Sequence, residues 1–412
     1  MIPEGWTIQS GEDLAITITK GSSPNWQGFH YQDSGILFVT SENVRDGYLD
    51  VSEPKYLPVA FSAKERKSQL RKGDILINIV GASIGRSCRF NLEGVEANIN
   101  QAVCVLRPRS SDLSDYIIQY LQSPGAIRKL LGQQSDSARP NLSLEDIRSF
   151  QFLVPPLAEQ KRIAEILSTW DRAIERTEKL IANSEAQKKA LMQQLLTGKK
   201  RLPGFDGEWQ KTKLGNLGRL LKGAGVSRDD VQEAGFPAIR YGEIYTTHHY
   251  FIEEFHSFIS PETAASSTPL RNGDILFTCS GETAEEIGKS VAFVGADKAF
   301  AGGDIIILRD HKQSPRFLGY ALNSPDLIRQ KTRFGQGNSV VHINARNLAE
   351  LTLDLPEFSE QEAIGKALDA AKNTLIRLRL RLEKLTTEKS ALMQQLLTGK
   401  RRVKIKGEAQ AA

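Results

Sequence analysis

The ten-residue stretch ALMQQLLTGK lies at residues 190–199 and recurs, letter for letter, at residues 391–400. Ten identical residues do not arise twice by chance in a chain of 412 residues. Two of the three methionines, Met192 and Met393, occupy the same position in the two copies. The chain therefore contains an internal repeat, and the period of that repeat decides what kind of fold to expect.

The repeat extends far beyond these ten residues. LRKGDIL at 70–76 returns as LRNGDIL at 270–276, and LVPPLAEQKRI at 153–163 returns as LDLPEFSEQEAI at 353–364. The offset stays between 200 and 203, so nearly the whole chain is one unit of about 200 residues written twice. This indicates duplication of a whole domain and its connector, because solenoid repeats are only about 20–50 residues long.

The length and composition of the chain narrow the classes of protein to consider. A chain of 412 residues is too long for one hydrophobic core, so two or more domains are expected. It has no run of eighteen apolar residues and no signal-peptide pattern, which predicts a cytoplasmic protein without a membrane span. Cys88, Cys104 and Cys279 lie in apolar runs and are expected to be buried, reduced thiols. A net charge of +5 favours a polyanionic partner, though weakly.

Each repeat divides into two parts of different character. Residues 1–156 and 202–356 carry short apolar runs punctuated by Gly, Pro, Asn and Asp, which predicts two mixed α/β globules. Residues 157–201 and 357–400 carry a helical pattern instead, and residues 401–412 form a basic and polar tail. The predicted fold class is α+β: two pseudo-symmetric mixed α/β domains separated by two long helices that form an intramolecular antiparallel coiled coil.

Apolar residues recur at alternating spacings of four and three along both predicted helices, which is the period of a coiled-coil seam. Lys188 and Lys389 interrupt the two series at the same place. The favoured arrangement is one antiparallel pair forming a stiff rod with a globule at each end. The alternatives are parallel helices of a homodimer and surface helices that merely cover each globule. The seam residues are Ile163, Leu167, Trp170, Ile174, Ile181, Leu191, Leu195, Ile364, Leu368, Leu375, Leu378, Leu382, Leu385, Leu392 and Leu396.

Proline and glycine mark the ends of these helices. Proline residues before both patterns place the starts, and Ser359 with Glu362 predicts a capping box at the second start. Gly198 and Gly399 are expected to take a left-handed conformation just after the helices end.

The sequence contains no recognisable motif for catalysis or metal binding. GETAEEIGKS at 281–290 has six residues between its first glycine and GKS, where a phosphate-binding P-loop needs four; its counterpart GASIGRS at 81–87 has three. The spacing of His248, His249 and His256 fits no zinc pattern, so a solvated or base-contacting loop is the better interpretation. We therefore expect a binding protein with no catalytic residue, no metal and no cofactor of its own.

The repeated segments resemble one known family. GDIL after a basic residue, the PPLAEQKRIAEIL start and LMQQLLTGK end of a long helix, and KGAGVSRDDV with FPAIRYGEIYT at 222–246 are similar to the specificity subunit of type I restriction–modification systems. The resemblance covers essentially residues 1–400.

This resemblance implies two target-recognition domains, at 1–156 and 202–356, each reading one half of a bipartite double-stranded DNA target. The paired helices would separate the readers and dock two modification subunits, which would carry S-adenosylmethionine and the methylation chemistry. Two restriction subunits, using ATP and Mg, would complete the assembly. The chain itself would be non-catalytic.

Polar and basic segments recur at matching places in the two globules. QQSDSARPNLS at 133–143 corresponds to RFGQGNSVVHIN at 333–344, and both precede the last strand of their globule. Such side chains can read base edges or bind phosphates. The candidate DNA contacts are Lys20, Arg45, Ser83, Arg86, Arg139, Asn141, Lys222, Arg228, Arg240, Lys289, Arg333, Gln336, Asn338 and His342.

These loops differ between the copies while the helices match, as expected if each globule reads a different half-site and two equal partners bind two equal helices. The competing class of protein is a structural adaptor with a coiled-coil stalk and two protein- or sugar-binding heads. DNA affinity that falls steeply with salt would separate the two classes.

Overall fold

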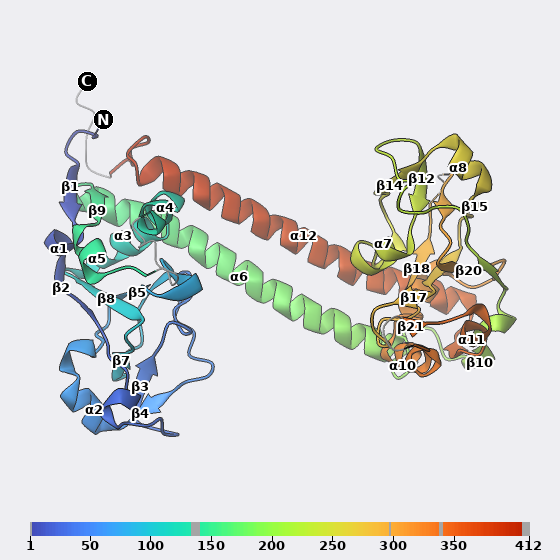
Figure 1. Cartoon of the computed structure of the whole chain (residues 1–412), viewed down its shortest axis with the longest axis horizontal. Coiled ribbons are helices and arrows are strands. Elements are labelled where there is room, and N and C mark those ends of the chain that lie inside the picture. The colour runs from blue at the N-terminus through green and yellow to red at the C-terminus, as the bar shows by residue number, and fades with distance from the viewer. Residues whose placement is uncertain (1, 133–140, 296–297, 338–340, 406–412) are drawn as a thin grey trace. The chain divides into compact units, whose positions relative to one another are not determined.

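The structure is a computed structural model that describes residues 2–132, 141–295, 298–337 and 341–405. The chain forms two compact units. Unit 1 comprises Met1–Glu178 and Leu380–Ala412, and unit 2 comprises Lys179–Arg379. Each unit contains one mixed globule together with part of both long helices (Figure 1). The predicted mixture of helices and strands with two long helices is confirmed.

Unit 1 is built on a four-stranded antiparallel sheet and a smaller three-stranded sheet. The first has the order β2 (Ala15–Lys20), β8 (Val103–Pro108), β5 (Ile75–Asn78), β6 (Ser87–Arg89); the second has the order β4 (Tyr56–Leu57), β3 (Ile36–Val39), β7 (Ala97–Ile99). A separate pair joins β1 (Thr7–Ser10) to β9 (Gln151–Val154). The short helices are α1 (Gly11–Leu14), α2 (Val59–Lys64), α3 (Ser111–Leu121), α4 (Pro124–Leu131) and α5 (Leu144–Ser149).

Unit 2 repeats this plan with additional strands. Its larger sheet has the order β11 (Arg219–Lys222), β20 (Ile305–Arg309), β16 (Ile275–Thr278), β18 (Ser290–Phe293), β13 (Tyr250–Ile252). The smaller sheet has the order β14 (Ser257–Ile259), β12 (Phe236–Ile239), β19 (Phe300–Ala301), β15 (Thr268–Pro269). Two separate pairs join β10 (Gln210–Lys213) to β22 (Thr352–Leu355) and β17 (Ser280–Gly281) to β21 (Val341–His342). The short helices are α7 (Tyr241–Thr246), α8 (Pro261–Ser266), α9 (Pro315–Ala321), α10 (Pro325–Phe334) and α11 (Ala345–Ala349).

The inner strands β5 and β16 are buried on both faces, which explains their consecutive apolar residues Ile75–Ile77 and Ile275–Phe277. In unit 1, Ile75 and Ile77 of β5 pack in the core with α3, while Leu76 points to the other face and packs with β3 and β7. In unit 2, Ile275 and Phe277 likewise face α9, and Leu276 faces the smaller sheet. Helices therefore cover one face of each larger sheet, and the smaller sheet covers the other.

The repeated LR-x-GDIL segment holds a buried ion pair in each globule. The carboxylate of Asp74 accepts two hydrogen bonds of 2.7 Å from the Arg107 guanidinium, and that of Asp274 accepts bonds of 2.6 and 2.9 Å from Arg309. Each carboxylate also accepts the backbone N–H of the arginine three residues earlier in its segment. Asp74 and Asp274 are 1% and 2% exposed, so each buried carboxylate needs the hydrogen bonds and charge of its arginine, which explains why both partners recur in the repeat.

The long helices α6 (Leu157–Leu195) and α12 (Phe358–Leu396) run in opposite directions within each unit (Figure 1). In unit 1, Asp171 near the middle of α6 lies 2.5 Å from Lys389 near the end of α12. In unit 2, Glu185 lies 2.7 Å from Arg379. Residues later in α6 therefore meet residues earlier in α12, which is the antiparallel order that the sequence predicts.

The residues that follow one long helix bind the start of the other. After α12, Arg402 donates to the Glu159 carboxylate in the first turn of α6 (Nε to Oε2, 2.8 Å). After α6, Arg201 donates to Glu360 in the first turn of α12 at 2.5 and 2.6 Å. Glu159 and Glu360 are 3% and 0% exposed. Each pair lies within one unit, so Arg402, which the sequence assigns to a basic tail, belongs to the folded part of unit 1.

The helix termini agree with the sequence in one respect and differ in another. Gly198 and Gly399 have φ of +66° and +68°, so the predicted left-handed residues are confirmed. The predicted capping box is wrong, because α12 already begins at Phe358 and Ser359 lies inside its first turn. The Ser359 hydroxyl donates to the Glu357 carboxylate at 2.5 Å, and Glu362 accepts from Ser314 instead.

Burial along α6 and α12 follows the 3.5-residue spacing. All fifteen predicted seam residues are buried or half-buried, whereas Leu180, Ile376 and Leu380, which lie off the seam, are exposed. Interlocking of the two rows of side chains as a coiled coil stays a prediction.

The cysteines and the membrane prediction can also be checked against the described residues. Cys88 and Cys104 are buried, Cys279 is half-buried, and all three are free thiols. In the part of the chain that the structure describes, no helix has the length and apolar character needed to cross a membrane.

Candidate nucleic-acid interface

The topology brings several of the predicted DNA contacts to one edge of each larger sheet. In unit 1, β2 and β5 both run antiparallel to β8, so they end at the same edge, where β6 begins. Lys20 is the last residue of β2, and Ser83 and Arg86 lie in the turn between β5 and β6. We call this side of each globule, where β2 and β5 or β11 and β16 end, the polar edge.

The polar edge of unit 1 also includes Asn141 and Leu142, which lie just before α5. Asn141 forms an antiparallel bridge with Val80, and the Leu142 amide donates to the Ile79 carbonyl at 2.8 Å. Ser83 accepts a hydrogen bond of 3.1 Å from the Asn78 amide, which is buried at the end of β5. Asn141 and Ser83 therefore lie on neighbouring segments of one surface.

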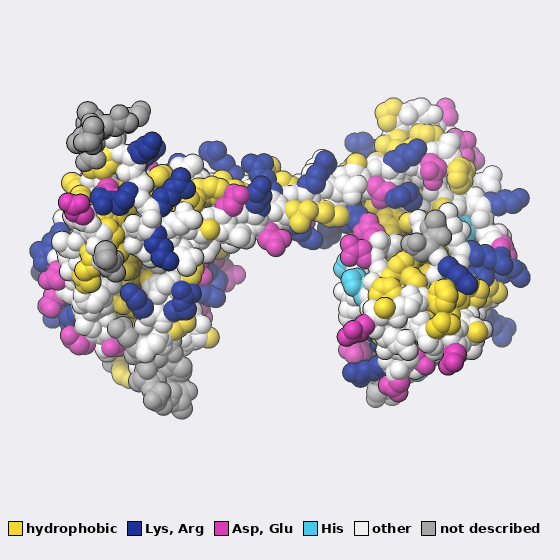
Figure 2. Space-filling model, turned by 90° about the horizontal axis from the view of Figure 1, so that it is seen from above, with side chains coloured by type: hydrophobic (Ala, Val, Ile, Leu, Met, Phe, Trp, Pro, Cys, Tyr) yellow, Lys and Arg dark blue, Asp and Glu magenta, His cyan; other side chains and the backbone are white. Residues whose placement is uncertain are grey.

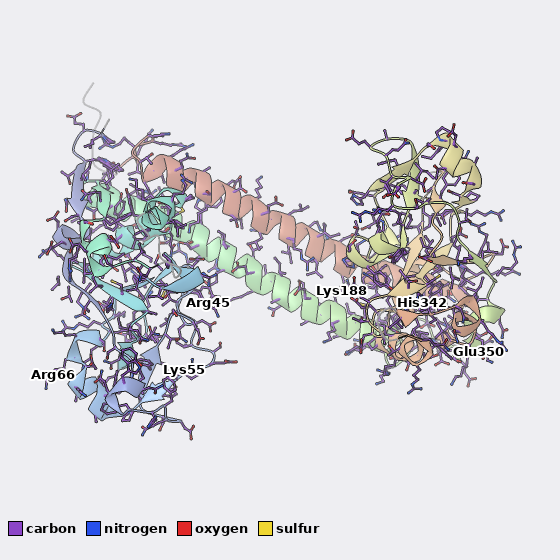
Figure 3. The ribbon with its side chains drawn as sticks, in the orientation of Figure 1. Arg45, Lys55, Arg66, Lys188, His342 and Glu350 are labelled. Atoms are coloured by element: carbon purple, nitrogen blue, oxygen red, sulfur yellow. The ribbon has the colours of Figure 1, made fainter. Side chains whose placement is uncertain are left out.

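Two arginines beside this edge have acidic neighbours. Arg86 lies 3.8 Å from Asp46, and Arg45 lies 3.5 Å from Asp50. The Gly47 amide donates to the Ser87 carbonyl at 3.0 Å, which brings the loop carrying Arg45 to the β5–β6 turn (Figure 3). Arg45 is half-buried and Arg86 is exposed, so both guanidinium groups remain within reach of a ligand.

The polar edge of unit 2 repeats the same backbone arrangement with different side chains. Ser280 of β17 pairs with His342 of β21, and the Ser280 hydroxyl lies 3.0 Å from His342 Nδ1. Gln336 and His342 exchange backbone hydrogen bonds of 2.8 and 3.0 Å. The structure thus brings together Gln336, His342 and Ser280 (His342 is labelled in Figure 3). Ser280 was missed by sequence reasoning, although a Ser-Gly pair directly after a buried strand was a usable signal.

A groove of about 900 Å³ in unit 2 contains Lys222, Arg228 and Arg240, three of the predicted contacts. Lys222 and Arg228 are exposed. Arg240 is half-buried, and its Nε donates to the Ser257 hydroxyl at 3.1 Å. At Gly223 a Cβ atom would lie 2.1 Å from the Gly302 carbonyl oxygen, so only glycine allows the two backbone segments that form this groove to approach.

Lys289 and the buried Lys331 support the turn before β18. The Lys289 ammonium donates to the Tyr245 carbonyl in α7 at 2.8 Å, and burial lowers its pKa. Lys331 is 1% exposed; its ammonium donates to the Gly288 and Leu322 carbonyls at 2.7 and 2.9 Å. Burial lowers the pKa of Lys331 to about 7. Lys289 is therefore held by the protein itself and is less free to bind DNA than Lys222.

The remaining sequence candidates fall into three groups. Arg333 is exposed near the end of α10, before Gln336. Arg139 and Asn338 lie outside the described residues. His248 is buried and burial lowers its pKa, whereas His249 is exposed beside the start of β13. Across residues 2–132, 141–295, 298–337 and 341–405, no group of His, Cys, Asp and Glu is placed to hold a metal ion.

On the face that Figure 2 shows, positive charge is spread out rather than gathered in one patch. Figure 2 shows Lys and Arg side chains along the visible face of the long helices and mixed with Asp and Glu over both globules. The polar edges therefore offer hydrogen-bonding groups beside single cations, an arrangement that can combine base reading with phosphate contacts. Direct contact of any of these residues with DNA stays a prediction.

Two mixed globules of one duplicated unit, each with a polar edge, and two antiparallel helices define a two-domain binding protein. The chain belongs to the type I restriction modification DNA specificity domain family, whose model matches residues 3–184 and 206–386. This is the family that the repeated segments resemble. The competing interpretation, a structural adaptor with two protein- or sugar-binding heads, is not favoured.

Individual relatives agree with this assignment. The chain is 23% identical over 425 residues to the type I restriction enzyme MjaVIII specificity subunit of Methanocaldococcus jannaschii, covering 98% of this chain and 94% of the relative. Its fold is similar to that of the type I restriction–modification S subunit from M. genitalium, with a TM-score of 0.59, 15% identity and coverage of 96% of each chain. A chain from a structure on assembly and conformational transition of the type I R-M system gives a TM-score of 0.60 at 16% identity, covering 97% of this chain and all of that chain.

Proposed function

We propose that this chain is the non-catalytic DNA-recognition subunit of a type I restriction–modification complex, in which each globule reads one half of a bipartite target. The observation that carries the proposal is the pair of polar edges. The bridge between Val80 and Asn141 in unit 1 recurs as the pairing of Ser280 with His342 in unit 2, with different side chains. Base edges are read by hydrogen bonds, so one backbone with exchanged polar side chains suits two readers of different sequences.

The exposed cations would set the position of each globule on the duplex. Lys20, Lys222 and Arg228 are exposed, and the first two end equivalent strands. Lysine and arginine bind phosphates without regard to sequence, whereas Asn141, Gln336 and His342 carry both donors and acceptors suited to bases. This division of labour predicts that loss of a lysine weakens binding to all duplexes, while loss of a polar-edge residue changes which duplex is bound.

The duplicated helices would bind two modification subunits. Gln193 and Gln194 are exposed in the first copy of ALMQQLLTGK, as are Gln394 and Gln395 in the second. Folding requires the buried leucines of this segment but gives no reason for identical exposed glutamines. Equal partners bound to equal helix surfaces account for that identity.

The complete assembly would work in the cytoplasm. The two modification subunits would bind S-adenosylmethionine and methylate the target, and two restriction subunits would use ATP and Mg. This chain would bind double-stranded DNA and these subunits, and would hold no cofactor.

Duplex binding at several salt concentrations tests the proposal directly. We expect the affinity of the purified chain for DNA to fall steeply between about 50 and 200 mM salt, because phosphate contacts release counterions. Mapping of methylated adenines in cells that carry this chain and its modification subunit should reveal a motif of two half-sites with an unspecified spacer. A continuous motif, or methyl transfer by the purified chain alone, would contradict the proposal.

A further inference from the structure

Unit 2 contains a cavity of about 680 Å³ between the last part of α6, the middle of α12 and the residues in and around β13. Its walls combine apolar side chains, among them Met192, Tyr250 and Leu375, with the cations Lys188, Lys372 and Arg379. All of these residues belong to unit 2. The cavity thus offers positive charge inside a partly apolar recess on the helices.

The ammonium group of Lys188 has no acidic partner among the described residues. It lies 4.6 Å from the centre of the Tyr250 ring, and no hydrogen bond or ion pair joins it to the described part of the chain (Figure 3 labels Lys188 on α6). Burial lowers its pKa, and the nearby charges of Lys372 and Arg379 lower it further. By contrast, Lys372 is paired with Glu253, and Arg379 is paired with Glu185 at 2.7 Å.

The equivalent place in unit 1 is occupied by the chain's own carboxylate. Lys389 is the counterpart of Lys188 at an offset of 201, and its ammonium lies 2.5 Å from Asp171. Asp171 also accepts a hydrogen bond of 2.6 Å from the Gln119 amide. The residue of unit 2 that corresponds to Asp171 is Lys372, so unit 2 has a second cation where unit 1 has the neutralising carboxylate.

We propose that this cavity of unit 2 receives the carboxylate of an Asp or Glu side chain from the modification subunit that docks on the helices. The inference rests on the proposed function, which supplies that partner. A carboxylate entering the recess would restore at Lys188 the ion pair that Asp171 and Lys389 form in unit 1. The two docking positions then share the repeated ALMQQLLTGK surface but differ at this ion pair, because the lysine of unit 1 is already neutralised by Asp171.

The charge around the cavity favours a side chain over a DNA phosphate. Glu253 and Glu254 are exposed in the cavity wall, and Glu185 lies beside them. These carboxylates repel the continuous negative charge of a duplex, whereas one carboxylate on a protein side chain can pass them and reach the ammonium. Inside the recess a charge-assisted hydrogen bond is stronger than in water because the surroundings are less polar.

The test is assembly of the full chain with its modification subunit, without DNA, using Lys188→Met. We expect one of the two stepwise dissociation constants to rise by about tenfold or more and the other to stay unchanged, since only one docking position uses Lys188. The melting temperature of the variant should not fall, because Lys188 has no ion pair to lose. Lys211→Met, which removes an exposed charge from β10, is the matched control and should leave both constants unchanged.

Zero-length carbodiimide cross-linking of the natural complex identifies the contact itself. We expect a cross-linked peptide that joins Lys188 to an Asp or Glu of the modification subunit. Equal assembly of Lys188→Met and the natural chain, or absence of that peptide, would overturn the inference. A variant that loses affinity for DNA on its own while assembling normally would identify the occupant as a phosphate and overturn it as well.

Failure of the proposed function would give a different result. A chain that binds no DNA but loses one modification subunit upon Lys188→Met would refute DNA reading and support the docking site. A natural chain that binds no modification subunit would overturn the docking site, whatever its affinity for DNA.

Discussion

Asp74 and Asp274 form the same buried pair with Arg107 and Arg309, whereas Asp171 and Lys372, which also occupy equivalent positions, carry opposite charges. The first pair of positions directly precedes an inner strand of each larger sheet, where loss of the aspartate would leave the arginine of the neighbouring strand without its charge partner. The second lies on the long helices, where a partner can supply what the chain has lost. The comparison indicates that the two copies keep the same stabilising contacts in their interiors, whereas residues on their binding surfaces can differ.

The polar edges follow the same rule. Backbone pairing is retained between the segments at Val80 and Asn141 and those at Ser280 and His342, because both complete the edge of a buried sheet. The side chains that these segments present to solvent are not required for that pairing. They can therefore differ between copies without any loss of fold stability.

Exchanging a whole globule is the change from which we expect the largest effect. Replacement of residues 202–356 by the corresponding globule of another family member should change one half of the methylated target completely and leave the other half as it was. The expected reason is that the strands forming the described part of this polar edge, β11, β16, β17 and β21, all belong to unit 2. Methylome mapping of the chimaera decides the matter. A change in both half-sites would show that the globules do not read independently.

Removal of a shared buried carboxylate should produce the largest loss of stability. Asp274→Ala leaves the Arg309 guanidinium, 7% exposed as a residue, without its charge partner, at a cost of roughly 3–5 kcal/mol. Asp74→Ala should cost somewhat less, because the Arg107 side chain is 17% exposed against 8% for Arg309. Denaturant unfolding, with each unit followed separately by hydrogen exchange, measures both. Equal stability of Asp274→Ala and the natural chain would show that the pair does not hold the globule.

Much of this architecture was readable from the sequence because it is written twice. The repeat predicts the two mixed globules, and the seam spacing predicts the long helices. These helices are observed to begin at Leu157 and Phe358. The predicted capping box failed because Ser-x-x-Glu describes a cap only if the helix starts after the serine, and here the first turn already includes Ser359.

Contacts between distant segments were not readable in the same way. Glu159 and Arg402 are separated by 243 positions, and nothing local marks the arginine as more than part of a basic run. The hydrogen bond between Ser280 and His342 likewise depends on strand pairing across 62 positions. The exchange of Asp171 for Lys372 was visible in the sequence, but its meaning depends on the antiparallel contact that places Lys389 beside Asp171.

The contacts that join each helix end to the opposite helix start offer a smaller test of the same comparison. Glu360→Ala removes the acceptor of the Arg201 guanidinium and of the Trp209 indole N–H, at a cost on the order of 2 kcal/mol. Glu159→Ala should cost less, since the Arg402 side chain is 46% exposed and water can replace the lost acceptor, against 25% for Arg201. Denaturant unfolding of the two variants measures which of them loses more stability. A larger loss for Glu159→Ala would show that exposure of the arginine does not set the difference.

The smallest expected effect concerns Lys331, a buried cation of unit 2 that has no lysine counterpart in unit 1, where Leu130 or Leu131 occupies the equivalent segment. Burial lowers its pKa from the usual value near 10.5 to about 7 in the folded protein. Between pH 7 and 10 the unfolded chain therefore binds a proton that the folded chain has released, so the free energy of unfolding rises with pH. Below pH 7 both states are protonated, and the cost of burying the charge is present in full.

Lys331→Met removes this titration while leaving the other ionisable groups in place. The stability of the natural chain relative to the variant should increase from pH 7 to pH 9.5 by more than about 1.4 kcal/mol, the equivalent of one unit of pKa shift. The variant also loses the hydrogen bonds to Gly288 and Leu322, which displaces the difference by a nearly constant amount and does not change its slope. Denaturant unfolding at both pH values measures the slope directly. A difference that stays flat with pH would mean that the Lys331 ammonium remains protonated in the fold, stabilised by those two carbonyl groups beyond what its burial alone would allow.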